Sequence, residues 1–363
     1  MQERLSPTTQ LLYSELLEQS IHAAAEEAMA AHPPGSFVEK SIRGRQYWYL
    51  QTSVGGDRHQ TYLGPDSKLL RGWIERTRNA RRRLEPAERS RAELAGMMTR
   101  GGASTVDPAL LRVLELLSDA GVFRLGGVLV GTHALGVYGN MLGVRWSGDS
   151  LRTHDLDIAQ DPVIGVGLLS GLEAPSIPDV LRDSGLGFFA IPTLDPRQPS
   201  TSFSIRGREL RVDFLTPLHG PERSRPIYLP SLKVSAQPLR LLDYLIEDSV
   251  QGMAIGRRKA LLVNVPQPAR FALHKLWTST RRAVAFQAKA TKDQIQAAAL
   301  IEVLLDDRPS DLEAAWRELD RRPKVRADIR RVAGRLGRRG LDQGPLDEFL
   351  ELLGATVNET PAG

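Results

Sequence analysis

The sequence predicts an α+β protein in which a mixed sheet with helices forms the core, a helix and a small β-meander precede it, and a helical domain follows it. Three observations lead to this prediction. Short apolar strands and helical stretches are interspersed from about residue 101 to 265. A β-rich stretch with turn residues lies before them, and strand-forming residues become rare after them. We therefore expect three domains, residues 1–100, 101–265 and 266–363.

The amino-terminal region is expected to contain two helices. Apolar residues recur at near-helical spacing from Ser6 to about Ala31, and two prolines then end the pattern. We expect Asp66 to cap a second, basic helix that runs to about Met98. The segment "TRGGAST" after it indicates a flexible joint, with a domain boundary near Gly101.

A three-stranded meander is expected between these helices. Turn residues at Arg43-Gly44 and at 55–57 divide the stretch 35–67 into three β-rich pieces. Aromatic and basic residues alternate within it: Tyr47, Trp48, Tyr49 and Tyr62 with Lys40, Arg43, Arg45 and Arg58. The mixture fits stacking on a nucleic acid, but a small sheet also needs large side chains for its own core, so both interpretations stay open.

Positive charge is concentrated in two clusters, although Lys and Arg outnumber Asp and Glu only by 48 to 43. The first cluster comprises Arg71, Arg76, Arg78, Arg81, Arg82 and Arg83, and the second comprises Lys324, Arg326, Arg330, Arg331, Arg335, Arg338 and Arg339. Such clusters either follow a phosphate backbone or form a solvated helix face. On the first interpretation, RNA or tRNA is a partner, contacted by Arg81, Arg82, Arg83, Arg330 and Arg331.

Composition excludes several classes of site. There is no cysteine, which rules out disulfides, thiolate zinc sites and a cysteine nucleophile. No apolar run is long enough to span a bilayer, and the first residues, "MQERLSPTTQ", lack the order of a secretory signal. We therefore expect a cytoplasmic protein without a membrane partner, in which any metal is bound by oxygen or imidazole.

The core begins with a candidate phosphate site. A helix is expected from Pro108 to Ala120, followed by a strand at Val128–Val130 and a helix that begins at Gly131-Thr132. A strand that runs directly into a helix exposes backbone N–H groups, here with a hydroxyl beside them, to an anion. Gly131 and Thr132 are therefore predicted to contact phosphate.

Two carboxylates lie on the next predicted strand, "RTHDLDIA". Side chains alternate along a strand, so Asp155 and Asp157 share one face while His154, Leu156 and Ile158 lie on the buried one. Carboxylates this close converge on one Mg²⁺ or bracket two ions. Further on, "SFSIRGRELRVDFLTP" predicts a hairpin that turns at Arg206-Gly207 and supplies a third carboxylate, Asp213, on an otherwise apolar strand.

The segments "GTHALGVYGNMLG", "THDLDIA", "VDFLTP", "ARFALHKL" and "KDQIQAAALI" resemble a bacterial family of uncharacterised nucleotidyltransferase-fold proteins. Its superfamily is the polymerase-beta-like nucleotidyltransferases, and the AbiEii-type toxin nucleotidyltransferases are more distantly similar. The resemblance implies that Gly131 and Thr132 hold the triphosphate, with Thr132 in the place of a serine. It implies that Asp155 and Asp157 bind a metal pair, and that Asp213 shares the catalytic metal and helps to deprotonate the attacking hydroxyl.

One feature departs from this pattern. The 23 residues from Thr132 to Asp155 exceed the usual spacing, so the loop between them either folds over the nucleotide or displaces its site. Asp149 in this loop is expected to be a turn residue.

Two lysines in the carboxy-terminal part are further candidates for nucleotide binding. Lys275, Thr278 and Arg282 share one helix face, so Lys275 is expected to reach the phosphates or the base. The resemblance implies that Lys292, with Asp293, positions the nucleotide or braces two domains, although ordinary ion pairing explains such charges equally well.

Two helical features are also expected in this part. Thr291 and Gln294 form a capping box that predicts a helix beginning at Lys292. An apolar stripe follows at helical spacing: Val325, Ile329, Val332 and Leu336.

The function predicted from these residues is a nucleotidyltransferase that uses Mg²⁺ or Mn²⁺ to move NMP from an NTP to RNA, particularly a tRNA end, or to a protein, releasing pyrophosphate. The rival is a module of the same fold that binds a nucleotide or nucleic acid without turnover. A metal phosphohydrolase is disfavoured because its His-Asp pair belongs on a helix, so His133, His154, His219 and His274 are expected to be ordinary polar residues. A glycosyltransferase is disfavoured because too little α/β sequence precedes Asp155.

Overall fold

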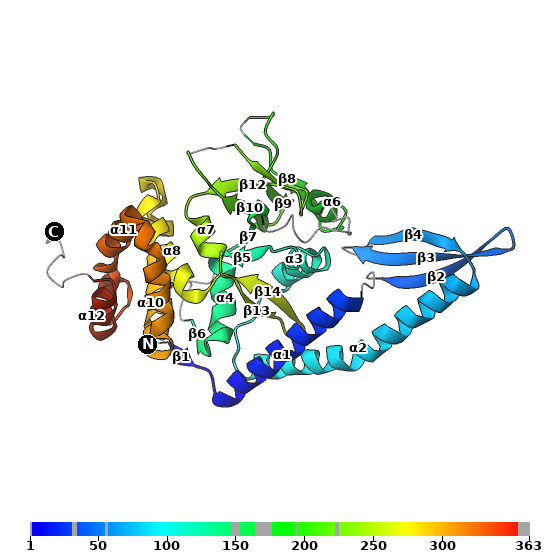
Figure 1. The fold of residues 1–363 in the computed structure, drawn as a ribbon, viewed down its shortest axis with the longest axis horizontal. Coiled ribbons are helices and arrows are strands. Elements are labelled where there is room, and N and C mark those ends of the chain that lie inside the picture. Colours follow the sequence, from blue (N-terminus) through cyan, green and yellow to red (C-terminus); the bar gives the residue numbers. More distant parts are fainter. Residues whose placement is uncertain are drawn as a thin grey trace.

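The computed structural model describes residues 2–30, 35–54, 57–146, 153–163, 176–193, 195–221 and 225–354. Figure 1 shows a central body built on a mixed sheet, a bundle of carboxy-terminal helices at one end, and an arm that projects from the other end. The fold is α+β, as predicted.

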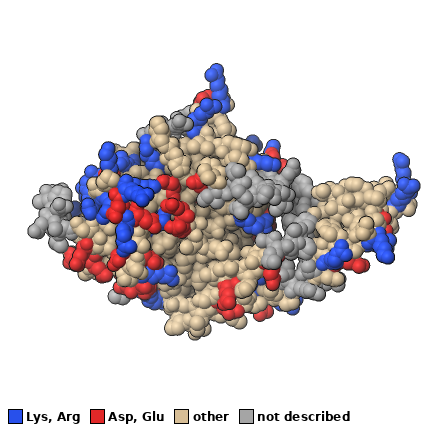
Figure 2. Space-filling view, viewed as in Figure 1, with Lys and Arg blue, Asp and Glu red and all other residues tan. Residues whose placement is uncertain are grey.

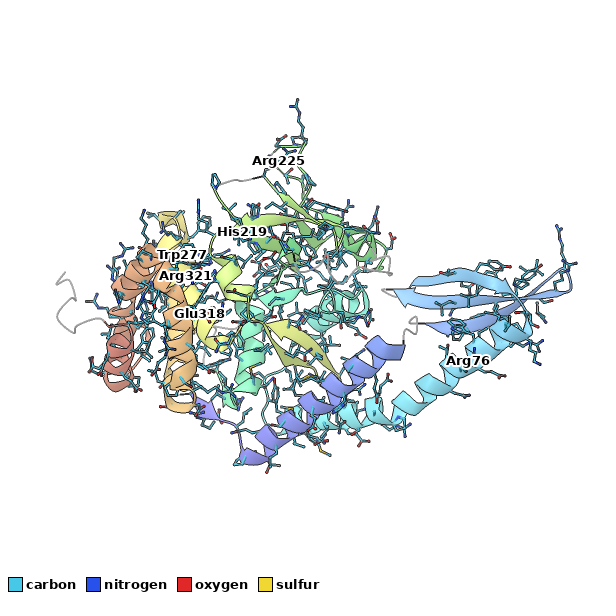
Figure 3. All side chains as sticks on the ribbon, viewed as in Figure 1. Arg76, His219, Arg225, Trp277, Glu318 and Arg321 are labelled. Atoms are coloured by element: carbon cyan, nitrogen blue, oxygen red, sulfur yellow. The ribbon has the colours of Figure 1, made fainter. Side chains whose placement is uncertain are left out.

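The arm consists of two long helices and a meander. Its elements are α1 (Pro7–Ala30), β2 (Ser36–Ile42), β3 (Arg45–Val54), β4 (Asp57–Pro65) and α2 (Lys68–Arg100). Both pairs of neighbouring strands are antiparallel, in the order β2-β3-β4, so the predicted meander is confirmed. Figure 3 shows Arg76 on α2, which runs beneath the sheet.

The two faces of the meander have different roles. Trp48 and Leu50 are buried and pack with Phe37 against Ile74 of α2, which gives the arm a small core of its own. Alternation turns Tyr47 and Tyr49 to the opposite face. There Tyr62, 53% exposed, has its ring centroid 6.1 Å from that of Tyr47 and 5.5 Å from that of Tyr49. Trp48 is therefore structural, and three tyrosines remain on the open face.

The predicted cap of α2 is wrong by one residue. Ser67, not Asp66, precedes the first helical residue, and its hydroxyl accepts a hydrogen bond from the backbone N–H of Leu70. The Asp66 carboxylate is used elsewhere, because it accepts a hydrogen bond from Trp48 Nε1 at 3.0 Å and pairs with Arg71 at 3.0 Å. Asp66 thus ties the meander to the start of α2.

The arm is anchored to the central body by a buried apolar cluster. Tyr13 and Leu16 of α1 and Met98 of α2 pack with Met253 of β13 (Val250–Ile255), which pairs with β14 (Ala260–Val265). The segment 101–104 lies here, and it is held in place rather than forming the flexible joint expected. The backbone N–H of Ala103 donates to Met98 O at 3.0 Å. The Asn140 side chain bonds both the N–H and the C=O of Ser104.

The central sheet has the order β11-β12-β10-β7-β5, with β9 pairing with both β10 and β8. Strand β10 is parallel to β7 and to β12, and the other pairings are antiparallel, so the sheet is mixed as predicted. Its strands are β5 (Val128–Val130), β7 (Asp155–Ala159), β8 (Phe188–Ala190), β9 (Ser202–Ile205), β10 (Arg211–Pro217), β11 (Ile227–Leu229) and β12 (Val234–Leu239). The elements around it are β1 (Glu3–Arg4), which pairs with β6 (Val144–Arg145), and the helices α3 (Pro108–Asp119), α4 (Gly131–Met141), α6 (Ile177–Arg182) and α7 (Leu242–Ile246).

The carboxy-terminal part is helical, as predicted. Its elements are α8 (Pro268–Arg281), η2 (Val284–Phe286), α9 (Gln287–Asp307), α10 (Pro309–Arg317), η3 (Glu318–Arg321), α11 (Pro323–Ala333), η4 (Leu336–Arg339) and α12 (Gln343–Leu352). The predicted capping box is wrong, because α9 begins at Gln287 and Thr291 lies inside it. The Gln294 side chain instead contacts Ser279 and Arg339.

The apolar stripe of this part packs inward as predicted. Ile329, Val332 and Leu336 are buried, and Val325 is partly buried against the same core. The stripe therefore joins α11 and η4 to the rest of the bundle.

Some residues of the second basic cluster form ion pairs or hydrogen bonds within the helical part. Arg331 pairs with Asp328, which also pairs with Arg281 of α8. Arg330 donates to the backbone carbonyl of Leu353 at 2.9 Å. Figure 2 shows Lys and Arg side chains over the carboxy-terminal helices and at the far end of the arm. The side chains of Arg81, Arg82 and Arg83 lie outside the described part, although their backbone belongs to α2.

Among the described ranges, no helix is both long enough and apolar enough to cross a bilayer.

We predict that the arm depends on the cluster at its base. Leu16 is fully buried and Leu11, on the same helix, is 72% exposed. Leu16→Ala should lower the free energy of unfolding by about 2–5 kcal/mol, because it leaves a cavity between the arm and the body, and Leu11→Ala should change it by less than about 0.5 kcal/mol. Denaturant titration measures both values, and equal losses would contradict the packing described.

Candidate active site

The three predicted carboxylates lie on adjacent strands. In the parallel pairing of β7 with β10, Asp157 lies opposite Asp213 and Asp155 lies opposite Arg211. Residues that face each other across a parallel pair, or lie two apart on one strand, share a face of the sheet. Asp155, Asp157 and Asp213 therefore project from the same face, while the alternate residues Leu156 and Val212 are fully buried.

The Gly131-Thr132 turn lies beside the middle carboxylate. Strand β5 is antiparallel to β7, with Val130 opposite Asp157, so the chain enters α4 directly next to Asp157. Gly131 has φ 71°, and a Cβ at this position would collide with Oδ2 of Asp157. Only glycine fits both the left-handed backbone and the close approach of the carboxylate.

The amino terminus of α4 has the properties predicted for a phosphate site. Val130, the residue before the helix, supplies no side-chain cap to its first N–H groups. Thr132 lies in the first turn, and its Oγ1 accepts a hydrogen bond from Gln296 Nε2 of α9 at 3.3 Å. The carboxy-terminal helices thus reach the predicted phosphate site, a contact that local sequence patterns did not indicate.

Burial and like charge act together on Asp157. The pKa of its carboxyl is raised to about 7, mainly by burial and then by the neighbouring Asp213 carboxylate, while the positive charges of Lys275 and Arg211 oppose the rise. A buried carboxylate beside two others is a strained arrangement at neutral pH. It is relieved by a proton or by a cation.

Asp213 already has a cationic partner. Arg211 Nε donates to Asp213 Oδ1 at 2.7 Å, and the same guanidinium donates to Ser202 Oγ at 3.0 Å. No three Asp, Glu or His side chains within the described residues form a closed metal-binding cluster. The structure therefore brings the three carboxylates to one face but does not show a formed coordination shell.

The sequence led us to expect that Lys275 reaches the phosphates or the base, and in the structure an ion pair holds its ammonium group. Lys275 is 9% exposed, and its Nζ pairs with Asp293 Oδ1 of α9 at 2.7 Å. Arg282 pairs with the other oxygen, Oδ2, at 3.0 Å. Two cations of one predicted face thus converge on a buried aspartate, and Lys275 acts on Asp157 as a fixed charge held by α9.

Lys292 is a second lysine that interacts electrostatically with a carboxylate of the sheet, Asp155. Partial burial lowers the pKa of its ammonium group, the nearby Lys275 lowers it further, and Asp293 and Asp155 oppose the shift. Lys292 is therefore a second positive charge on the α9 side of Asp155, next to the Lys-Asp pair that joins α8 and α9.

Three of the histidines considered in the sequence lie in different surroundings. His154 is not on the buried side as expected, because β7 begins only at Asp155; its side chain is 66% exposed and its Nε2 lies 3.1 Å from Glu209. His219 is exposed on the loop that follows β10, away from the strand end that carries Asp213 (Figure 3). His274 is buried in α8, which lowers its pKa to about 4.

Sequence reasoning missed a cavity next to this site. A cavity of about 340 Å³ is lined by Thr132, His133 and Gly136 of α4 and by residues of the segment 104–107 and of β13. Thr153 and His154, which immediately precede Asp155, and Leu210 complete its wall. Its residues come from five separate stretches of the chain, so no local pattern could have indicated it. Asp149 and the rest of the segment 147–152 lie outside the described residues.

Comparison with known proteins gives one match. A family model described as nucleotidyltransferase matches residues 109–320, which is more than half of the chain and includes all of the carboxylates and lysines above. Neither the curated proteins nor the solved structures contain a significant match.

We predict that Gly131 is required for its close approach to Asp157 and not only for its backbone angle. Gly207, in the hairpin turn between β9 and β10, has φ 72°, but a Cβ at this position would meet no neighbouring atom, so it is a matched control. Gly207→Ala should cost about 1–2 kcal/mol of stability from the left-handed backbone alone. Gly131→Ala should cost about 1–3 kcal/mol more, because the methyl group displaces Asp157. Equal costs in denaturant titration would show that the contact is unimportant.

Proposed function

Because the chain belongs to this nucleotidyltransferase family, we propose that it transfers NMP from an NTP to an acceptor hydroxyl with the help of Mg²⁺ or Mn²⁺ and releases pyrophosphate. One observation carries the proposal. Asp155, Asp157 and Asp213 share a face of the sheet, directly beside the Gly131-Thr132 turn at the start of α4. Carboxylates next to a phosphate site are the arrangement that metal-assisted phosphoryl chemistry needs.

The residues present suit a divalent cation. Carboxylate oxygen is the ligand that Mg²⁺ and Mn²⁺ prefer, and a bound cation would offset the burial and the neighbouring Asp213 charge that raise the pKa of Asp157. Asp155, Asp157 and Asp213 would hold the ion or ion pair. When bound, a divalent cation supplies charge neutralisation for the phosphate oxygens and lowers the pKa of an attacking hydroxyl.

The residues of the chain would then bind and orient the nucleotide. Backbone N–H groups at the start of α4, with the Thr132 hydroxyl, would hold the phosphates. Lys292 would lie along the triphosphate, and Lys275 would add a fixed positive field from behind Asp157. A developing negative charge is stabilised most by groups that do not need to reorganise, and the ion pair of Lys275 with Asp293 keeps that lysine in place.

Asp213 is the proposed acceptor of the proton. The acceptor oxygen would form a bond to the α-phosphorus, the bond from that phosphorus to the pyrophosphate oxygen would break, and the hydroxyl proton would pass to Asp213. Arg211, which donates to Asp213 in the structure, would orient this carboxylate.

We propose RNA as the acceptor. The open face of the meander carries Tyr47, Tyr49 and Tyr62, and Lys40 Nζ lies 4.9 Å from the ring centroid of Tyr49. Exposed rings with cations between them bind single-stranded nucleic acid by stacking and charge attraction. The second basic cluster supports this proposal less, because Arg330 donates to the Leu353 carbonyl and Arg331, although 61% exposed, pairs with Asp328 of its own helix.

We predict that the aspartates are required for transfer. With each labelled NTP, Mg²⁺ or Mn²⁺, and a pool of RNA and protein acceptors, Asp155→Asn and Asp157→Asn should each lower the rate at least about 100-fold, because they remove charge that holds the cation. Asp183→Asn, which changes an exposed carboxylate next to α6, should leave the rate unchanged. Full transfer by either site variant would overturn the metal assignment. Absence of transfer by the wild type, with stabilisation by NTP, would favour the non-catalytic module.

We also predict that the tyrosine face binds RNA. Tyr49→Ala and Tyr62→Ala should each weaken binding by about 1–3 kcal/mol through lost stacking. Tyr228→Ala is the control, because Tyr228 is 56% exposed but lies on β11 of the central sheet. Fluorescence anisotropy with single-stranded RNA measures the affinities, and the affinity of the wild type should fall steeply with salt. A salt-independent affinity, or equal losses from all three variants, would exclude this face as the RNA site.

A further inference from the structure

The cavity beside α4 adjoins the proposed catalytic centre. Thr132, which begins the proposed phosphate site, and His154, which precedes Asp155, both line it. Lys275, Lys292 and Gln296 approach the same centre from α8 and α9 and are not part of the cavity wall. The carboxylates therefore lie between a side that carries lysines and a side that opens into the cavity.

The wall of the cavity suits an uncharged, partly apolar group. None of the described residues that line it is Lys or Arg, and the single carboxylate is Asp107. Asp107 caps α3 by accepting hydrogen bonds from the N–H groups of Ala109 and Leu110. Leu110, Val137 and Met253 supply apolar surface. A phosphate would find no cation in this wall, whereas a planar heterocycle would find both apolar contact and polar atoms.

One polar atom of the wall has no partner. His133 Nε2 is buried and accepts or donates no hydrogen bond among the described residues. By contrast, the Asn140 side chain is fully paired with the backbone of Ser104: its oxygen accepts from the N–H and its nitrogen donates to the carbonyl. Burial lowers the pKa of His133 to about 4, so the imidazole is neutral at physiological pH and has one donor and one acceptor nitrogen. An unsatisfied buried nitrogen at the wall of a cavity is suited to the hydrogen-bonding edge of a ligand.

The glycines of α4 also support a ligand in the cavity. Glycine inside a helix is less stable than alanine, so each one needs a reason. At Gly139 the reason is packing, because a Cβ would collide with Trp146 Nε1 and with the Val144 carbonyl. At Gly136, which lines the cavity, a Cβ would have no heavy atom of the described residues within 4 Å. No described neighbour requires glycine at this position, whereas a ligand in the cavity would.

We propose that this cavity holds the base of the NTP, with His133 hydrogen-bonded to the edge of the base and Gly136 leaving room for its ring. The inference rests on the proposed function and extends it, because it assigns nucleotide selectivity to α4. The triphosphate would lie between the start of α4 and the lysines of the helical part, and the ribose would span from Thr132 to the cavity. His133 and Gly136 would then determine which base is accepted.

The experiment fills the cavity with a larger side chain at position 136 and measures nucleotide binding. Equilibrium binding is measured in Mg²⁺ for α,β-methylene analogues of ATP, GTP, CTP and UTP, and for tripolyphosphate, which has no base. Gly136→Phe places a ring where the structure has open space, and Gly136→Ala is the matched control. Gly136→Phe should weaken binding of the best analogue at least about tenfold and leave tripolyphosphate binding unchanged. Gly136→Ala, whose methyl group fills much less of the space, should weaken analogue binding less than Gly136→Phe and should also leave tripolyphosphate binding unchanged.

A second variant tests the hydrogen bond separately. His133→Ala should reduce the preference of the wild type for its best nucleotide over its worst by about tenfold, because the lost group reads the edge of the base, and should not alter tripolyphosphate binding. Thermal unfolding verifies that each variant is folded, and Gly136→Leu, which fills less of the space, replaces Gly136→Phe if that chain does not fold.

The outcomes separate this inference from the proposed function. Binding of all analogues by Gly136→Phe as tightly as by the wild type would overturn the base assignment and leave the proposed function intact. If Gly136→Phe binds the analogues normally but no longer transfers NMP, the cavity belongs to the acceptor. That result would also overturn the base assignment. If the wild type binds neither the analogues nor tripolyphosphate, the proposed function itself fails.

Discussion

The structure of this site depends on the contact between Asp157 and its two neighbours. The parallel pairing of β7 with β10 sets Asp213 beside it, and the antiparallel pairing with β5 sets Gly131 against its carboxylate. The sheet thus places three carboxyl groups where the helix α4 begins, and burial and like charge raise the pKa of Asp157 to about 7. A helix amino terminus favours an anion, and carboxylates favour a cation. On the proposed function, a phosphate that shares a cation with the sheet would satisfy both preferences.

The helical part completes the site by fixing positive charge on one side. Asp293 is 3% exposed and forms ion pairs with both Lys275 and Arg282. The packing of α8 against α9 and the electrostatics of the site therefore depend on the same ion pairs. Gln296, one turn further along α9, contacts Thr132. Removing Asp293 would leave a buried lysine without its partner, which is costly in a protein interior. The described wall of the cavity beside α4 contains no Lys or Arg and one carboxylate, Asp107, so it differs in charge from the lysine-bearing side of the site.

Much of this arrangement was predictable from local sequence. Alternation on "THDLDIA" and "VDFLTP" indicated that the aspartates face one side, and the glycine at the end of an apolar strand indicated a turn into a helix. Contacts between distant segments were not predictable in this way. Lys275, an expected phosphate contact, forms an ion pair with Asp293 of a different helix, and the wall of the cavity comes from five separate stretches. Alternation also failed for His154, because the strand begins one residue later. The caps of α2 and α9 were wrongly predicted, because Asp66 and Gln294 bind side chains distant in the sequence, Trp48 and Arg339, instead of capping a helix.

The central claim is that Asp155, Asp157 and Asp213 form one cation site. Electron paramagnetic resonance titration of the protein with Mn²⁺, in the presence of a non-reactive NTP analogue, tests it most directly. The account predicts saturable Mn²⁺ binding by the wild type. That binding should be lost in Asp157→Asn and retained in Glu209→Gln, which changes a carboxylate on the same hairpin that contacts only His154 in the described structure. Equal Mn²⁺ binding by the wild type and Asp157→Asn would contradict the account.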